Sequence, residues 1–86
     1  MKVLLFAGAR DAVGATELEL SLSELLPASQ TTLTARSLLD AFCARHPSLQ
    51  PYASSLRVAI NGAYAAWDAS VSDGDEVAII PPVAGG

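Results

Sequence analysis

The chain has 86 residues, of which 51% are hydrophobic and 16% charged, and its formal net charge is −4. This length accommodates one domain with a single core and leaves no room for a second domain. The basic residues are scattered along the chain instead of clustered, which argues against a nucleic-acid-binding protein; they are Lys2, Arg10, Arg36, Arg45 and Arg57.

Nothing in the sequence indicates a membrane or an export signal. No apolar run approaches the roughly 20 residues of a membrane helix. The opening "MKVLLFAGARDAVG" lacks the long apolar segment and the cleavage site of a signal peptide. The single Cys43 cannot form an internal disulfide, which is typical of proteins from a reducing compartment. We therefore expect a cytoplasmic protein that binds neither nucleic acid nor a membrane.

Two strands are predicted before the middle of the chain. Residues 2–8, "KVLLFAG", are apolar and extended in character, and residues 9–16 are predicted to form a loop broken by Gly14. Residues 17–22, "ELELSL", alternate strictly, so Leu18, Leu20 and Leu22 share one face of a half-buried strand. A linker is expected at residues 23–33.

One helix is predicted, from about Ala35 to His46. Thr34 is a suitable N-cap, and Pro47 prevents the helix from continuing. Ala35, Leu38, Leu39 and Phe42 recur at the spacing of one helical stripe. A second linker is expected at residues 48–55.

The rest of the chain returns to strands. Residues 56–60 and a short strand at 63–67 flank Asn61-Gly62, a pair that strongly favours a tight hairpin turn. A loop at 68–75 precedes a last strand at 76–80. The order predicts an α+β fold, in which one main helix crosses one face of a mixed sheet of four to five strands.

Strand alternation assigns the two faces of this sheet. Because Lys2, Arg57 and Glu76 require water, the side chains expected toward the helix are Val3, Leu5, Ala7, Val58, Ile60, Val77 and Ile79. The opposite face would carry Leu4, Phe6, Ile80 and Tyr64, and four large apolar groups on a free face suggest a docking surface. The alternative is that these are ordinary scattered apolar residues.

The C-terminal stretch "PPVAGG" has an unusual composition. Pro81 and Pro82 each lack a backbone donor, so the last strand stops there and the chain leaves it extended. Six residues span at most about 20 Å, enough to enter a deep pocket of another protein. Gly85 and Gly86 make the end as thin as a polypeptide can be. A structural tail gains nothing from two glycines, so the terminal carboxylate is the candidate reactive group; a disordered end or a cloning remnant is the alternative.

Three stretches resemble the MoaD-type sulfur carriers, the small subunits of molybdopterin synthases. They are "LLFAGARDAVG", "TARSLLDAFCARHPSL" and "VAINGAYAAWDASVSDGDEVAIIPPVAGG". The likeness as a whole covers nearly the entire chain. The most specific is Asp73-Gly74-Asp75-Glu76-Val77 followed by the terminal PPVAGG. The resemblance is imperfect, because residues 63–67 are rich in alanine and the segment 21–33 is long.

The resemblance implies a ubiquitin-like β-grasp domain at residues 1–80 and an extended Gly-Gly tail at 81–86. An adenylating enzyme of the MoeB type would use ATP to join Gly86 to AMP, and sulfur would then replace AMP to give a thiocarboxylate. A MoaE-type large subunit would receive that sulfur for a cyclic pyranopterin precursor and would hold the catalytic side chains. This chain would bind no cofactor and would not be an enzyme on its own. The implied partner-binding residues are Leu4, Phe6, Tyr64, Ile80, Pro81, Pro82, Val83, Ala84 and Gly85.

Other candidate site residues have simpler interpretations. Cys43 fits a small buried residue better than a sulfur relay, and His46 fits a partner of the helix dipole. With one histidine and one cysteine, a protein-only zinc site is not expected. Turn chemistry accounts for Asp68, Asp73 and Asp75, although with Glu76 they could form an acidic collar that steers the tail toward basic partners.

Two other functions stay open at the level of sequence. One is a sulfur carrier for another pathway, such as the thiamine type, which also ends in Gly-Gly. The other is a protein modifier joined to lysines through Gly86, as ubiquitin is. The Pro-Pro-Val before the glycines and the Phe-Ala-x-x-Arg opening favour the molybdopterin branch.

Overall fold

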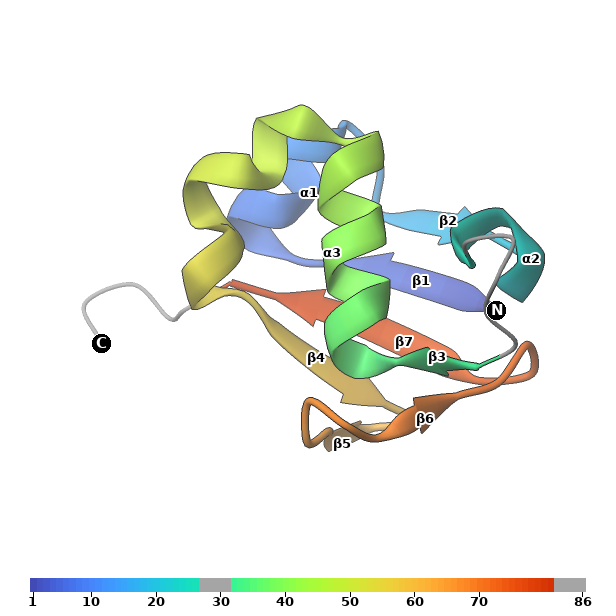
Figure 1. The fold of residues 1–86 in the computed structure, drawn as a ribbon. Coiled ribbons are helices and arrows are strands. Elements are labelled where there is room, and N and C mark those ends of the chain that lie inside the picture. Colours follow the sequence, from blue (N-terminus) through green and yellow to red (C-terminus); the bar gives the residue numbers. More distant parts are fainter. Residues whose placement is uncertain (27–31, 82–86) are drawn as a thin grey trace.

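The computed structural model describes residues 1–26 and 32–81. Its main sheet has five strands in the order β2-β1-β7-β4-β5 (Figure 1). These strands are β1 (Lys2–Leu5), β2 (Glu17–Glu19), β4 (Arg57–Ile60), β5 (Ala63–Tyr64) and β7 (Glu76–Ile80). β1 and β7 run parallel, and the other neighbours are antiparallel. The predicted mixed sheet is confirmed.

Helix α3 (Ala35–Arg45) lies across one face of this sheet (Figure 1). The predicted stripe is confirmed, since Ala35, Leu38, Leu39 and Phe42 are all buried. His46 is the C-cap, one residue beyond the helix.

The first turn of α3 has partners for its free backbone donors. Thr34 Oγ1 accepts from the Ser37 amide at 3.1 Å, and Ser37 Oγ accepts from the Thr34 amide at 2.9 Å, which is a reciprocal capping box. The amides of Ala35 and Arg36 donate to carbonyls of the loop that follows β5, at 2.9 and 3.0 Å. The loop is therefore attached to the start of the helix.

A second, two-stranded sheet pairs β3 (Leu33–Thr34) with β6 (Ser70–Val71). The sequence predicted a linker that includes Leu33 and a loop that includes Ser70 and Val71, which is wrong at these residues; Thr34 is the N-cap of α3 as predicted. Each strand has two residues, too few for an alternation pattern, and each exists because the other lies beside it. Leu33 and Val71 are buried as a result.

The predicted first strand is too long. It ends at Leu5, and α1 (Ala7–Val13) occupies most of the predicted loop. Ala7 has a φ of 47°, in the left-handed region, so the chain turns sharply there and Ala7 is exposed instead of facing the helix as predicted. Gly14 ends α1 with a φ of 84°, and its amide donates to the Arg10 carbonyl at 2.8 Å.

Two more helices replace predicted irregular segments. Leu22 was expected in the second strand but starts α2 (Leu22–Leu25), where Ser21 and Glu24 form a capping box. The 3₁₀ segment η1 (Pro47–Ser55) fills the second predicted linker. α1, η1 and the end of β7 lie together at one end of the molecule (Figure 1).

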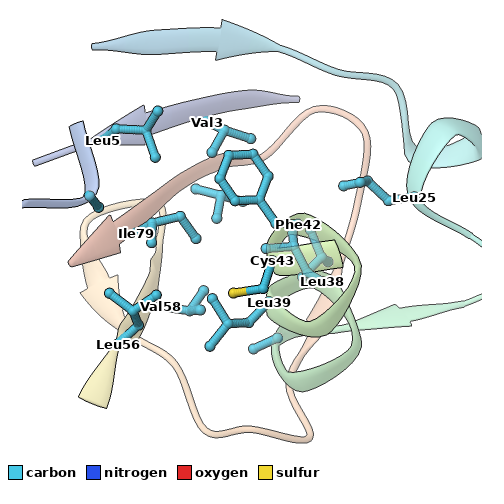
Figure 2. Close-up of a cluster of buried hydrophobic side chains, with 14 of the residues drawn as sticks. Val3, Leu5, Leu25, Leu38, Leu39, Phe42, Cys43, Leu56, Val58 and Ile79 are labelled. Atoms are coloured by element: carbon cyan, nitrogen blue, oxygen red, sulfur yellow. The ribbon is translucent and has the colours of Figure 1, made fainter. Parts of the chain in front are cut away.

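The core lies between the sheet and α3. Figure 2 shows Phe42 and Cys43 of α3 among Val3, Leu5 and other sheet side chains. Val3, Val77 and Ile79 are fully buried, as alternation predicted. Within the described residues, no helix is long and apolar enough to cross a bilayer.

Candidate functional site

The predicted tail begins at the middle of the sheet. β7 lies between β1 and β4, and it ends at Ile80, where Pro81 follows. Pro81 is partly buried, so the described chain leaves the sheet in contact with the domain. The predicted tail residues Pro82, Val83, Ala84, Gly85 and Gly86 lie outside the described residues.

Four strands align a row of side chains across the face away from α3. Leu4 pairs with Ala78, Ala78 with Ala59, and Ala59 with Tyr64. The two central members are alanines, whose methyl groups barely rise above the backbone. The middle of this row is therefore low, and its two ends are tall.

The next row toward the tail completes a hollow. Ile80 follows Ala78 on the same face of β7 and pairs with Arg57 of β4. Phe6 directly follows β1. The hollow has a volume of about 280 Å³. Its lining residues are Leu4, Phe6, Ala59, Gly62, Tyr64, Glu76, Ala78 and Ile80. We call its six apolar side chains, Leu4, Phe6, Ala59, Tyr64, Ala78 and Ile80, the outer apolar surface.

The structure thus brings together the four described non-proline residues that were predicted for docking. Tyr64 is 73% exposed and Phe6 48% exposed, values far above those of core residues. Ala59, which is 7% exposed, and half-buried Ala78 were not predicted as site residues, although strand alternation already placed both on this face. Because both side chains are small, they form the floor of the hollow and leave its volume open.

Charge on this face is divided along the direction of β7. Glu76 and Asp75 stand at the start of the strand, together with the Lys2 to Glu17 ion pair at 3.9 Å. Arg57 stands at the other end, beside Ile80. The carboxylates at 73–76 stand at the opposite end of β7 from Pro81, so they do not surround the start of the tail. That they steer the tail toward basic partners stays a prediction.

Two of those carboxylates accept hydrogen bonds from backbone amides. Asp75 accepts from the Ser72 amide at 2.8 Å and from the Asn61 side chain at 3.0 Å, and these bonds lower the pKa of Asp75. Asp73 accepts from the Leu22 amide at the start of α2. The predicted turn chemistry is confirmed for Asp75, whereas the Asp73 carboxylate binds the start of a distant helix instead of its own turn.

Cys43 and His46 lie on the other side of the sheet. Burial, and secondarily the Asp40 carboxylate, raises the pKa of the Cys43 thiol, which is 3% exposed. The His46 ring packs on Phe42 with centroids 4.6 Å apart. Neither side chain reaches the outer apolar surface. Among residues 1–26 and 32–81, no group of three histidine, cysteine or acidic side chains could hold a metal ion.

The sheet order and the crossing helix define a ubiquitin-like β-grasp domain, whose free face carries an apolar hollow beside the last strand. The sequence profile of the ThiS family matches residues 3–86. The chain belongs to the ThiS family.

Three similar proteins extend this assignment. A molybdopterin synthase sulfur carrier subunit of Arabidopsis thaliana is 40% identical over 86 residues, covering all of this chain and 82% of the plant protein. The Aedes aegypti protein of the same name is 35% identical over 89 residues, covering all of this chain and 88% of its own length. The crystal structure of small archaeal modifier protein 1 of Haloferax volcanii matches with a TM-score of 0.74 and 26% identity, over 95% of each chain.

Proposed function

We propose that this chain is the sulfur carrier subunit of a molybdopterin synthase and that Gly86 carries the sulfur. The observation that supports this most strongly is 40% identity, over the whole chain, to a plant protein of that name. The family profile also extends through Gly86, so the match includes the Gly-Gly end.

The chemistry follows from the properties of a carboxylate. At neutral pH it is ionised and resists nucleophiles, so it must first gain a leaving group. Its oxygen attacks the α-phosphorus of ATP and releases pyrophosphate, which gives an acyl-adenylate on Gly86. Sulfur supplied at the oxidation level of sulfide then forms a bond to the acyl carbon, breaks the bond to AMP and leaves a thiocarboxylate. When that sulfur passes to the pterin precursor, water restores the carboxylate.

The domain binds the partner proteins, and its tail extends into their active sites. The catalytic side chains belong to those partners. The outer apolar surface docks on the large subunit, and the six residues from Pro81 extend at most about 20 Å into its active site. The adenylating enzyme takes the same tail at an earlier step. Both partners meet a chain whose tail starts beside Ile80, next to the docking surface. The single Cys43 is consistent with work in the cytoplasm.

Intact mass spectrometry tests the proposal. The protein is purified from cells that make molybdopterin, and the expected mass gain equals the exchange of one oxygen for one sulfur. Tandem spectra should place that exchange on Gly86. The proposal fails if protein from competent cells, although active in sulfur transfer, never carries the exchange.

A persulfide on Cys43 would be the main confounding species. It adds a whole sulfur atom and is removed by dithiothreitol, whereas a thiocarboxylate survives that treatment. A Cys43→Ala variant provides the matched control, because it should retain the mass gain at Gly86.

A second candidate function is attachment to other proteins. It is supported by the likeness to the archaeal modifier, at a TM-score of 0.74. Both functions begin with adenylation, so the discriminating product is an isopeptide bond between Gly86 and a lysine. Immunoblots of the tagged protein would then show ladders that resist boiling in detergent and thiol, which a sulfur carrier does not form.

A further inference from the structure

Arg57 occupies a distinctive place on the outer face. It is the first residue of β4, it pairs with Ile80 across the sheet, and its side chain is exposed. Arg57 is thus the cation beside the point where the chain leaves the sheet toward its tail. A partner that covers the sheet face beside Ile80 would therefore also lie over Arg57.

The other cations of the chain already have partners. Lys2 pairs with Glu17 at 3.9 Å, Arg10 with Asp11 at 3.7 Å, Arg36 lies 5.2 Å above the Trp67 ring, and Arg45 donates to the Glu24 carbonyl at 3.2 Å. Within residues 1–26 and 32–81, Arg57 makes no ion pair, side-chain hydrogen bond or stacking contact. No contact in this described part of the chain occupies its five donors, which suit a ligand or a second protein.

Tyr64 lies next to this guanidinium. Tyr64 pairs with Ala59, two residues after Arg57 on β4, so the two side chains are diagonal neighbours on one face. They line a second hollow of about 310 Å³ together with Val58 and Ala65. Tyr64 also lines the apolar hollow, so it borders both the apolar hollow and the hollow that contains Arg57.

We propose that Arg57 is a specificity-determining residue of the docking surface and binds a carboxylate of the partner. The partner would present an apolar side chain to the hollow between Leu4, Phe6 and Ile80. An acidic side chain of the same partner would meet Arg57 and the Tyr64 hydroxyl. This inference rests on the proposed function, since it describes how the tail-receiving subunit is recognised.

Charge complementarity supports an acidic partner group at this place. The chain carries a net charge of −4, and at the start of β7 the cation Lys2 is already paired with Glu17, so Arg57 is the unpaired positive site of this face among the described residues. A carboxylate at the opposite end of the hollow would meet Glu76 and be repelled. The two ends of the face thereby fix the orientation of the partner, with its acidic group beside the root of the tail.

Binding to the purified large synthase subunit tests the inference, by calorimetry at low and high salt. Arg57→Gln should weaken binding roughly tenfold, because the partner's carboxylate is left buried without its donor. The affinity of Arg57→Lys should lie between those of wild type and Arg57→Gln, since lysine keeps the positive charge but lacks the planar guanidinium. Wild-type affinity should also decline more steeply with salt than that of Arg57→Gln.

Arg45→Gln is the matched control. It removes the same charge from the opposite side of the sheet, and its affinity should stay within about twofold of wild type. Circular dichroism should show all variants folded. A wild-type complex that Arg57→Gln leaves unchanged in affinity and salt dependence would overturn the role of Arg57 while the proposed function stands. A wild-type chain that neither binds the large subunit nor gains sulfur at Gly86 would overturn both.

Discussion

Asn61 and Asp75 connect two turns of this domain through a hydrogen bond of 3.0 Å between the Asn61 side-chain amide and Asp75 Oδ1. Asn61 has a φ of 52° in the turn between β4 and β5, and its Oδ1 accepts from the Glu76 amide at 3.0 Å. One asparagine thus ties the hairpin turn to the start of β7.

Asp75 should make stability dependent on pH. Hydrogen bonds from Ser72 and Asn61 lower the pKa of Asp75, so its ionised form favours the folded state. This contribution is complete above the ordinary aspartate pKa of about 3.9 and is lost as pH falls through the lowered pKa of the folded protein. Asp75→Asn should therefore be less stable than wild type at neutral pH.

Urea unfolding across this pH range measures the difference between wild type and Asp75→Asn. The difference in unfolding free energy between the two proteins should disappear as the solution becomes acidic. Asp68→Asn is the control, because no described hydrogen bond ends on the Asp68 carboxylate. Its difference in unfolding free energy from wild type should not change with pH in this way. A pH-independent gap for Asp75→Asn would contradict the proposed effect of its charge.

Ile79 and Ile80 are neighbours in sequence with opposite roles. Ile79 is 0% exposed in the core, and Ile80 lines the outer apolar surface. Ile79→Ala should cost about 2–5 kcal/mol of unfolding free energy, a large part of a total of about 5–15 kcal/mol. Ile80→Ala should cost about 1 kcal/mol and weaken binding to the large subunit. Chemical denaturation and calorimetry on both variants measure these effects. A larger loss of stability in Ile80→Ala than in Ile79→Ala would show that the two faces are assigned the wrong way round.

The Cys43 thiol should be unreactive in the folded protein. Burial raises the pKa of the thiol and blocks access, so a disulfide reagent should react slowly in buffer and rapidly in denaturant. Cys43→Ala should transfer sulfur at the wild-type rate. Fast labelling of native protein, or loss of transfer in that variant, would restore the sulfur relay as a candidate.

Gly86 should be essential for activity and dispensable for folding. Deleting it, or adding one residue after it, should abolish sulfur transfer because the reacting atom is missing or displaced. The melting temperature should not change, since the core residues that the structure describes end at Ile79. Retained transfer in the extended variant would show that the sulfur is carried elsewhere.

The parts of this protein that the sequence determined are those with local causes. The α3 helix has its cap, stripe and stop within residues 34–47, and the Asn61-Gly62 turn takes positive φ at both residues as predicted. Strand alternation also separated Ile79 from Ile80, because burial on one face needs only a period of two.

Tertiary structure decided the remainder. Leu33 and Val71 are strand residues because two distant segments meet, and α1 forms where Ala7 turns the chain back over the end of the sheet. The hollow itself depends on register, because Ala59 and Ala78 leave space only when β4 and β7 set them side by side. Sequence places each residue on a face, whereas pairing between strands far apart in the chain decides which residues become neighbours.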